Sequence, residues 1–351
     1  MGLKRQDWPA GIAERLTAGC AIPAHPLALN AARELDPKRQ RALSRYYLDA
    51  GSGGLAVGVH TTQFAIRERG LYETVLRIAA EAASERRDTP ILVGGAIGRT
   101  AQAVKEAQVA RGLGYHAILL SLAAWKGASE DEIIAHCEAV AAEMPLFGFY
   151  LQPAVGGVKL PLSFWRRFAA IENVVAIKMA PFNRYATLDV IRGVLEAGAQ
   201  DRIALYTGND DHIVADLLTP FTLSHQGRAV TLRIVGGLLG HWSVWTRGAV
   251  ELQRRCAAVR GGAIPAELLE LDAAVTEMNA AVFDVANDFH GVIAGCHEVL
   301  RRQGLLEGIW CLDDHESLSP GQAELLTAVA ERYPTLTDDA FVAANLHRWL
   351  S

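Results

Sequence analysis

A lysine inside an apolar run is the residue of this sequence with the clearest chemical potential. Lys178 lies in the segment 174–180, Val-Val-Ala-Ile-Lys-Met-Ala, which is typical of a buried strand. Burial penalises the charged ammonium and can lower the pKa of a lysine by several units. A neutral amine at pH 7 attacks carbonyl carbons, the first requirement of Schiff-base chemistry. The alternative is a strand-end lysine whose ammonium reaches solvent along its alkyl chain.

A phenol and a pair of hydroxyls follow runs of the same kind. Tyr150 lies near the end of segment 146–152, and Thr61 and Thr62 directly follow segment 55–60. Taken singly, a strand-end tyrosine is often an amphipathic rim residue, and paired threonines often only satisfy a turn. Whether these groups work with Lys178 therefore depends on the elements that carry them.

Eight short apolar runs recur along the chain, starting 26 to 36 residues apart: 20–24, 55–60, 91–96, 117–123, 146–152, 174–180, 203–209 and 231–237. Continuous apolar runs, unlike alternating ones, indicate strands buried on both faces, as in a parallel sheet. Amphipathic segments lie between them, such as 100–110, with Thr100 as the expected N-cap, and 129–144, which opens on the capping box Ser129-Glu130-Asp131-Glu132.

This alternation predicts an α/β fold, a (β/α)8 TIM barrel, with a doubly wound open sheet as the weaker alternative. In such a barrel, functional side chains gather at the carboxyl ends of the strands. Lys178, Tyr150 and the threonine pair would then meet on one face. This favours a catalytic role for them over purely structural roles at strand ends and turns.

The length of the chain leaves room for more than the barrel. Its 351 residues exceed the typical barrel of about 250 residues. We expect a barrel over 1–264 that carries the active site, and a C-terminal helical extension over 265–351 packed on the barrel. The expected helices of that extension cover 267–288, 291–303, 320–333 and 338–350.

Composition excludes several classes of partner. The net charge of −5 with interspersed signs argues against nucleic-acid binding, and no apolar stretch approaches the 18 residues of a membrane span. Five scattered cysteines without CxxC spacing, and no signal peptide, predict a cytoplasmic protein. Histidines on separate expected strand ends (His25, His60, His241) raise a zinc site as an alternative, but without an HxH or HExxH pair we expect no metal. His225 is expected in a solvated loop.

An ordered set of short motifs resembles the dihydrodipicolinate synthase / N-acetylneuraminate lyase family of class I aldolases. Each motif alone is weak, whereas the set with its spacing, including 117 positions between Thr61 and Lys178, is specific and covers the barrel and the helical tail. The matching residues are Ile22-Pro23-Ala24, Gly53-Gly54-Leu55, Thr61-Thr62, Tyr150, Ile177-Lys178 and Gly208-Asn209-Asp210.

The resemblance implies a Schiff-base-forming lyase acting on a small-molecule 2-oxo acid, typically pyruvate. Lys178 would form the imine, so that no cofactor is needed. Tyr150 would move protons as general acid and base, with the hydroxyl of Thr61 in line with it. Thr61 and Thr62 would bind the carboxylate, and the Gly208 carbonyl would lie near the methyl end of the ketoacid. The resemblance also implies a homo-oligomer, either a dimer or a tetramer.

Several positions depart from that family. Val155 stands where its synthases carry an arginine for the second substrate's carboxylate, and Ala124 where they carry a tyrosine that extends the proton relay. We therefore expect a different second substrate. Polar or aromatic residues at strand ends are candidates to bind it, His60 and Gln152 among them; the others are His25, Gln63, Trp125, Asn183, His241 and Trp242. The alternative hypothesis is a non-catalytic 2-oxo-acid-binding or sensory barrel.

Overall fold

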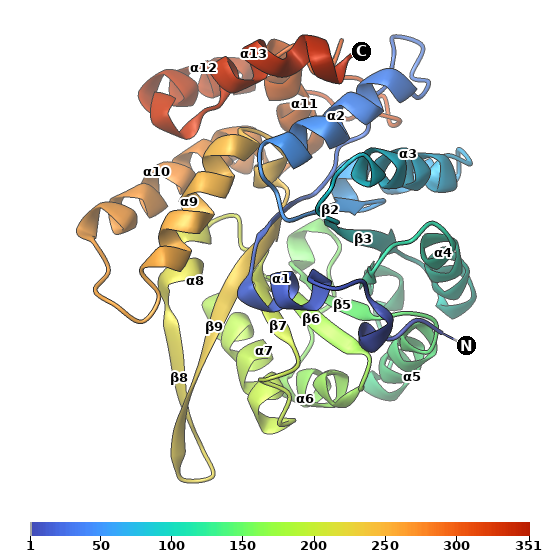
Figure 1. Cartoon of the computed structure of the whole chain (residues 1–351), viewed down its shortest axis with the longest axis vertical. Helices are drawn as coiled ribbons and strands as arrows, with labels where there is room; N and C mark the ends of the chain where they lie inside the picture. The colour runs from blue at the N-terminus through green and yellow to red at the C-terminus, as the bar shows by residue number, and fades with distance from the viewer. Residues whose placement is uncertain (1) are drawn as a thin grey trace.

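Eight parallel strands form a barrel surrounded by helices in the computed structural model, which describes residues 2–351 (Figure 1). The strands follow the order β1-β9-β7-β6-β5-β4-β3-β2, and a bridge between Ala24 and Ala56 brings β1 and β2 together. The (β/α)8 prediction is confirmed, and the open-sheet alternative is wrong. The barrel strands are β1 (Ala21–Pro23), β2 (Gly54–Val57), β3 (Ile91–Ala96), β4 (Ala117–Leu120), β5 (Leu146–Leu151), β6 (Val174–Ala180), β7 (Ala204–Thr207) and β9 (Arg228–Leu239).

The helices that alternate with these strands follow the amphipathic segments of the sequence. They are α2 (Pro37–Asp49), α3 (Tyr72–Ser84), α4 (Thr100–Gly112), α5 (Glu130–Ala141), α6 (Leu162–Ala170), α7 (Arg184–Glu196), α8 (Ile213–Leu218) and α9 (Thr246–Ala258). The capping box of α5 forms as predicted, with the Glu132 N–H donating to Ser129 Oγ and the Ser129 N–H donating to the Glu132 carboxylate. Helix α4 instead takes Arg99 as its N-cap, so Thr100 is its first residue and not the cap.

The last barrel strand differs from the prediction. Strand β9 begins at Arg228 and forms an antiparallel hairpin with β8 (Pro220–His225) before its carboxyl half joins the barrel beside β7 and β1. The hairpin extends well beyond the barrel in Figure 1. The segment around His225, predicted as a solvated loop, is therefore the end of a strand, and His225 is half-buried. Its short Gln226–Gly227 turn, with φ angles of 49° and 75°, is the signal for the hairpin.

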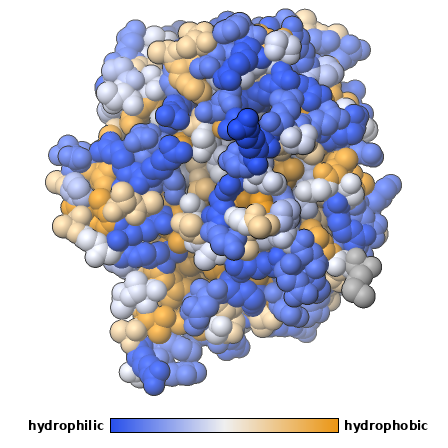
Figure 2. Space-filling view, viewed as in Figure 1, coloured by the Kyte–Doolittle hydropathy of each residue, from blue (hydrophilic) through white to orange (hydrophobic). Residues whose placement is uncertain are grey.

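Two apolar layers line the sheet. Side chains that point into the barrel include Phe147, Phe149 and Ala176, and Trp8, Ile12 and Leu16 pack against this inner cluster. These last three come from the N-terminal segment and α1 (Ile12–Ala18). Side chains on the opposite faces of the strands pack beneath the surrounding helices. Polar side chains cover most of the face seen in Figure 2, as expected for a fold that buries its apolar groups inside these layers.

The C-terminal helices pack on the barrel as one continuous core with it, since buried residues of both belong to the same apolar cluster. These helices are α10 (Ala266–Val282), α11 (Val292–Arg302), α12 (Gln322–Arg332) and α13 (Asp339–Trp349). The helix predicted over 267–288 ends early, because Asp284 adopts a left-handed φ of 54°. The domain boundary after residue 264 stays a prediction.

None of the helices in the described part of the chain has the length and apolar character needed to cross a membrane.

Candidate active site

Lys178 points into the barrel at the carboxyl-terminal half of β6. Its neighbours Ala176 and Ala180 belong to the inner apolar cluster, so alternation along the strand places Lys178 on the same side. The side chain is 8% exposed, and its Nζ lies 4.6 Å from the centre of the Phe149 ring. Within the described residues, Nζ has neither a hydrogen bond nor an ion pair. Burial lowers the pKa of Lys178 to about 8, an effect that the attraction of the Asp210 carboxylate opposes.

A pocket with an empty volume of about 640 Å³, its open mouth included, surrounds this amine. Its polar side chains are few and its walls are mainly apolar, the usual composition of a small-molecule site. The residues around it are Ala24, Val59, His60, Thr61, Leu119, Phe149, Leu151, Gln152, Val155, Lys178, Ala180, Phe182, Gly208, Asp210, Gly240, Phe283, Phe289 and Val292. Of the predicted site residues, the pocket therefore brings together Lys178, Thr61, His60, Gln152 and Gly208.

Asp210 is a pocket residue to which the sequence analysis assigned no role. It follows β7, is buried, and accepts a hydrogen bond of 3.1 Å from the His241 N–H. Burial raises the pKa of Asp210 to about 7, while the nearby Lys178 charge and the His241 N–H act to lower it. An acidic residue just beyond a barrel strand is the signal that could have identified it. The pocket thus pairs an amine that loses its proton easily with a carboxyl that holds its proton unusually well.

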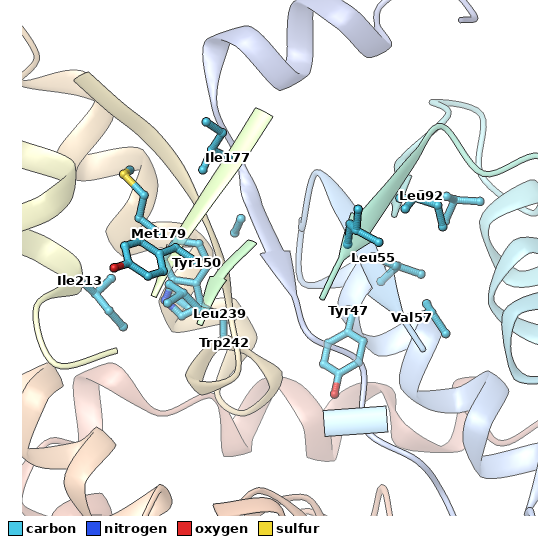
Figure 3. Packing of buried hydrophobic residues seen from close by; sticks show 14 of the residues in the cluster. Tyr47, Leu55, Val57, Leu92, Tyr150, Ile177, Met179, Ile213, Leu239 and Trp242 are labelled. Atoms are coloured by element: carbon cyan, nitrogen blue, oxygen red, sulfur yellow. The ribbon is translucent and has the colours of Figure 1, made fainter. Parts of the chain in front are cut away.

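Tyr150 does not face this pocket, and the prediction that it lies beside Lys178 is wrong. Phe149 is the residue in register with Lys178, and the adjacent Tyr150 points to the opposite face of β5. Its ring packs 5.1 Å from that of Trp165, and its hydroxyl accepts a hydrogen bond of 3.3 Å from the Leu160 N–H. Figure 3 shows Tyr150 within the apolar cluster that lies between the outer faces of the strands and the surrounding helices. Tyr150 is thus a buried packing residue, neither at the pocket nor at the rim of the barrel.

The two threonines have different environments. Thr61 lies on the pocket and its hydroxyl donates to the Ala24 carbonyl over 2.8 Å, so it is not in line with Tyr150. Thr62 is fully buried outside the pocket, where its hydroxyl donates to the His25 carbonyl and accepts from the N–H groups of Gly58 and Val59. The Thr62 hydroxyl therefore holds the turn and is not available to a substrate carboxylate.

This turn leaves backbone donors beside the amine. Within the described residues, the N–H groups of His60 and Thr61 make no hydrogen bond, whereas that of Thr62 donates to the Val59 carbonyl over 3.0 Å. Both free donors belong to residues that line the pocket. Consecutive backbone N–H groups can bind an anion without a charged side chain.

Replacing Thr62 with valine should therefore reduce stability. Valine keeps the shape of threonine but removes the 2.6 Å bond to the His25 carbonyl and leaves the N–H groups of Gly58 and Val59 without their partner. Each unsatisfied buried group costs about 1–3 kcal/mol. We expect a lower free energy of unfolding in urea titrations of Thr62→Val. Thr61→Val, which removes the bond to the Ala24 carbonyl and a longer one of 3.4 Å to the His25 carbonyl but leaves no N–H group unpaired, is the matched control and should lose less. A Thr62→Val protein as stable as the wild type would contradict this role.

His60 and Gly208 complete the surroundings of Lys178. Burial, and secondarily the Lys178 charge, lowers the pKa of His60 to about 4, so its ring is neutral at pH 7. A Cβ atom at Gly208 would lie 2.5 Å from the Cε atom of Lys178, so a glycine is needed to give the lysine room. The other strand-end candidates, which were His25, Gln63, Trp125, Asn183, His241 and Trp242, do not line the pocket.

Two of these other candidates have structural partners that explain them. Both ring nitrogens of His25 are engaged, one of them 2.8 Å from Ser44 Oγ. Asn183 caps α7 by accepting a hydrogen bond from the Ala186 N–H.

The sequence model of the dihydrodipicolinate synthetase family matches residues 19–228, more than half of the 351 residues. The chain belongs to the dihydrodipicolinate synthetase family. The match ends within the β8–β9 hairpin, so the pocket residues of β1 to β7 lie in the matched part and the C-terminal phenylalanines lie beyond it.

Curated relatives in this family are distant. A 4-hydroxy-tetrahydrodipicolinate synthase of Chelativorans sp. (strain BNC1) is 26% identical over 277 residues, which cover 78% of this chain and 85% of that protein. The synthase of Nitratidesulfovibrio vulgaris is 28% identical over 160 residues, which cover 45% of this chain and 54% of that protein. The chain thus spans little more than half the length of several curated relatives that it matches.

Solved structures share the fold at lower identity. A chloride-inhibited dihydrodipicolinate synthase from Acinetobacter baumannii, complexed with pyruvate, has a TM-score of 0.75 and 18% identity, covering 91% of this chain and 100% of that one. An N-acetylneuraminate lyase from Fusobacterium nucleatum has a TM-score of 0.72 and 16% identity, covering 91% and 99%. The chain is therefore a divergent member of the family with the same barrel.

Two departures from the family pattern occupy different places. Val155, at the end of the short helix η5 (Pro153–Val155), lines the pocket with an apolar side chain. Ala124 lies in the short helix η4 (Ala123–Trp125), and neither it nor Trp125 reaches the pocket. Trp125 instead stacks between Arg99 and His136. Of these two departures, the one at Val155 therefore lies at the pocket.

Proposed function

We propose that this protein is a Schiff-base-forming lyase or aldolase that acts on a 2-oxo acid of the pyruvate type through Lys178. The observation that carries the proposal is the environment of that amine: buried, without an ion pair in the described residues, and open to a small-molecule pocket at the carboxyl end of the barrel. Membership of the dihydrodipicolinate synthetase family supports the same reaction class.

The reaction would begin with the neutral amine of Lys178. Nζ attacks the C2 carbonyl carbon of the 2-oxo acid, and uptake of one proton with loss of one water leaves a protonated imine. When the bond between C3 and C4 breaks, its electron pair moves into the imine to form an enamine, while the C4 hydroxyl loses its proton and becomes an aldehyde. Protonation of the enamine at C3 and addition of one water then release pyruvate and restore the lysine. The imine needs no cofactor.

Asp210 is the group we assign to the proton transfers. It lines the pocket with Lys178, and a pKa near 7 lets a carboxyl both accept and donate a proton at neutral pH. The N–H groups of His60 and Thr61 would receive the substrate carboxylate, in place of the Thr62 hydroxyl that the turn occupies. His60 and Gln152 remain candidates to contact the rest of the substrate. The homo-oligomeric state stays a prediction.

Reductive trapping tests this function. Borohydride added with pyruvate should convert the imine to a stable amine and add the reduced three-carbon acid to the peptide that contains Lys178, as detected by mass spectrometry. Borohydride without pyruvate is the control. Absence of an adduct with pyruvate and with a panel of other 2-oxo acids would overturn the proposal.

The second candidate is a 2-oxo-acid-binding barrel without turnover. It is favoured by one observation, the position of Tyr150, whose phenol is turned away from Lys178. It predicts a trapped adduct at Lys178 but no carbon–carbon cleavage or condensation with any aldehyde. Turnover that disappears with Lys178→Met would dismiss it.

A further inference from the structure

Aromatic side chains form much of the lining of the pocket around Lys178. Phe149, Phe182, Phe283 and Phe289 line it, together with aliphatic side chains such as Val155. Among the described lining residues, Lys178 is the sole lysine or arginine, and His60 is neutral because its pKa is lowered to about 4. When the second substrate reacts, the nitrogen of Lys178 is part of a neutral enamine and supplies no positive charge. A second anionic group on the substrate would therefore meet apolar surface and the Asp210 carboxyl, with no cation to balance it.

Two of these phenylalanines are held in a strained conformation. Phe182, after β6, has a φ of 47°, and Phe289, in the loop between α10 and α11, has a φ of 67°. Left-handed backbone is uncommon for residues other than glycine and is strained for bulky side chains. Their rings nevertheless meet edge to face, 6.0 Å between centres and 72° between planes. Both rings are only half-buried at the pocket.

Hydrogen bonds from separate elements maintain this conformation. The Phe182 N–H donates to Asn209 Oδ1 over 3.1 Å, and the Phe289 N–H donates to the Asp284 carbonyl over 3.1 Å. The Asp284 carboxylate accepts from the Gly291 N–H and from the Ser319 hydroxyl, which ties the loop to the C-terminal region. Strain that surrounding contacts maintain is typical of functional sites. The strained backbone here places two half-exposed rings at the pocket that contains the reacting amine.

We infer that the second substrate is an uncharged aldehyde with an aromatic group, held against Phe182 and Phe289 while its carbonyl carbon faces the enamine on Lys178. The inference rests on the proposed function and names the substrate class of the same site. In the condensation direction, C3 of the pyruvate enamine attacks the aldehyde carbon, Asp210 donates a proton to the aldehyde oxygen, and water hydrolyses the imine. The product is a 4-aryl-4-hydroxy-2-oxo acid, and the reverse reaction returns pyruvate and the aldehyde.

Competing aldehydes test this substrate class. Purified protein with pyruvate would be given benzaldehyde, the anionic 4-carboxybenzaldehyde, aspartate semialdehyde, or the small hydroxylated glyceraldehyde, with product formation followed by chromatography and mass spectrometry. We expect kcat/KM for benzaldehyde to exceed that for each of the others by about tenfold or more, because only benzaldehyde buries an aromatic ring without burying a charge or polar hydroxyls.

Variants locate the effect on the two rings. Phe289→Ala and Phe182→Ala should raise KM for benzaldehyde by about tenfold, since each removes a ring contact, and should leave pyruvate trapping on Lys178 intact. Tyr185→Ala is the matched control, because that ring is 82% exposed on α7 outside the pocket. Phe289→Arg should shift the preference toward 4-carboxybenzaldehyde by supplying the missing cation.

The outcomes separate this inference from the proposed function. No pyruvate adduct on Lys178 would overturn the function itself. An adduct that forms normally, combined with a preference for aspartate semialdehyde or glyceraldehyde, or with no turnover of benzaldehyde, would overturn the aromatic substrate class and leave the function standing.

Discussion

Lys178→Met is expected to abolish turnover, with a loss on the order of 10⁴-fold or more, because an imine requires a primary amine and no other lysine is among the described residues that line the pocket. Methionine has a similar length and is apolar, so it fills the same space between Phe149 and Gly208 without an amine. The borohydride adduct should disappear together with activity. The measurement is kcat with pyruvate and an active aldehyde, alongside peptide mass spectrometry.

Stability provides the control for this variant. The wild-type amine is buried without an ion pair in the described residues, so burial destabilises its charged form, and methionine removes that cost. The free energy of unfolding of Lys178→Met should therefore equal or exceed that of the wild type. Lys126→Met, at an exposed position, should change neither activity nor adduct formation. Retained turnover in Lys178→Met would show that the reaction does not pass through this lysine.

Asp210→Asn is expected to lower kcat by about 10²–10⁴-fold, the usual cost of losing a general acid and base. Asparagine has the size of aspartate and can still accept a hydrogen bond from the His241 N–H, so the pocket should keep its shape. Trapping of pyruvate should persist, because the lysine is untouched. Asp211→Asn, next to it but not among the residues that line the pocket, is the matched control and should keep near-wild-type turnover.

The pH profile distinguishes a chemical role of Asp210 from a structural one. In the wild type, turnover requires a neutral Lys178, with a pKa of about 8, and an ionised Asp210, with a pKa of about 7, so the rate should rise as pH increases through this range. The Asp210 charge raises the pKa of Lys178, so its removal should lower that pKa further. The residual activity of Asp210→Asn should therefore begin its rise with increasing pH at a lower pH than the activity of the wild type. An unchanged pH profile would contradict the coupling of the two groups.

Tyr150→Phe separates the structure from the expectation of the sequence. The family resemblance implies a severe loss of rate at this position, whereas the structure places the hydroxyl on the Leu160 N–H, away from Lys178. With Asp210 as the proton carrier, Tyr150→Phe should keep much more turnover than Asp210→Asn. A loss of turnover in Tyr150→Phe equal to that in Asp210→Asn would show that Tyr150 takes part in the reaction.

The positions of barrel strands and of Lys178 could be inferred from the sequence because they depend on local pattern. Short apolar runs at regular intervals, separated by amphipathic segments and caps such as Ser129, determine a barrel with little ambiguity. The threonine turn after β2 was likewise recognisable from its place at a strand end, whereas Gly208 was assigned to the site through the family resemblance. His60 and Gln152 reached the pocket for the same reason, since residues just beyond the carboxyl ends of barrel strands gather on one face.

Which side of each strand faces the pocket was decided only by the tertiary structure. The run around Tyr150 is apolar on both faces, so its pattern contains no alternation to show that Phe149 points inward and Tyr150 outward; the pairing of Phe149 with Lys178 decides this. The same holds for contacts between distant segments. Phe289 reaches the pocket because the loop after α10 brings it there, and no local sequence pattern encodes that position.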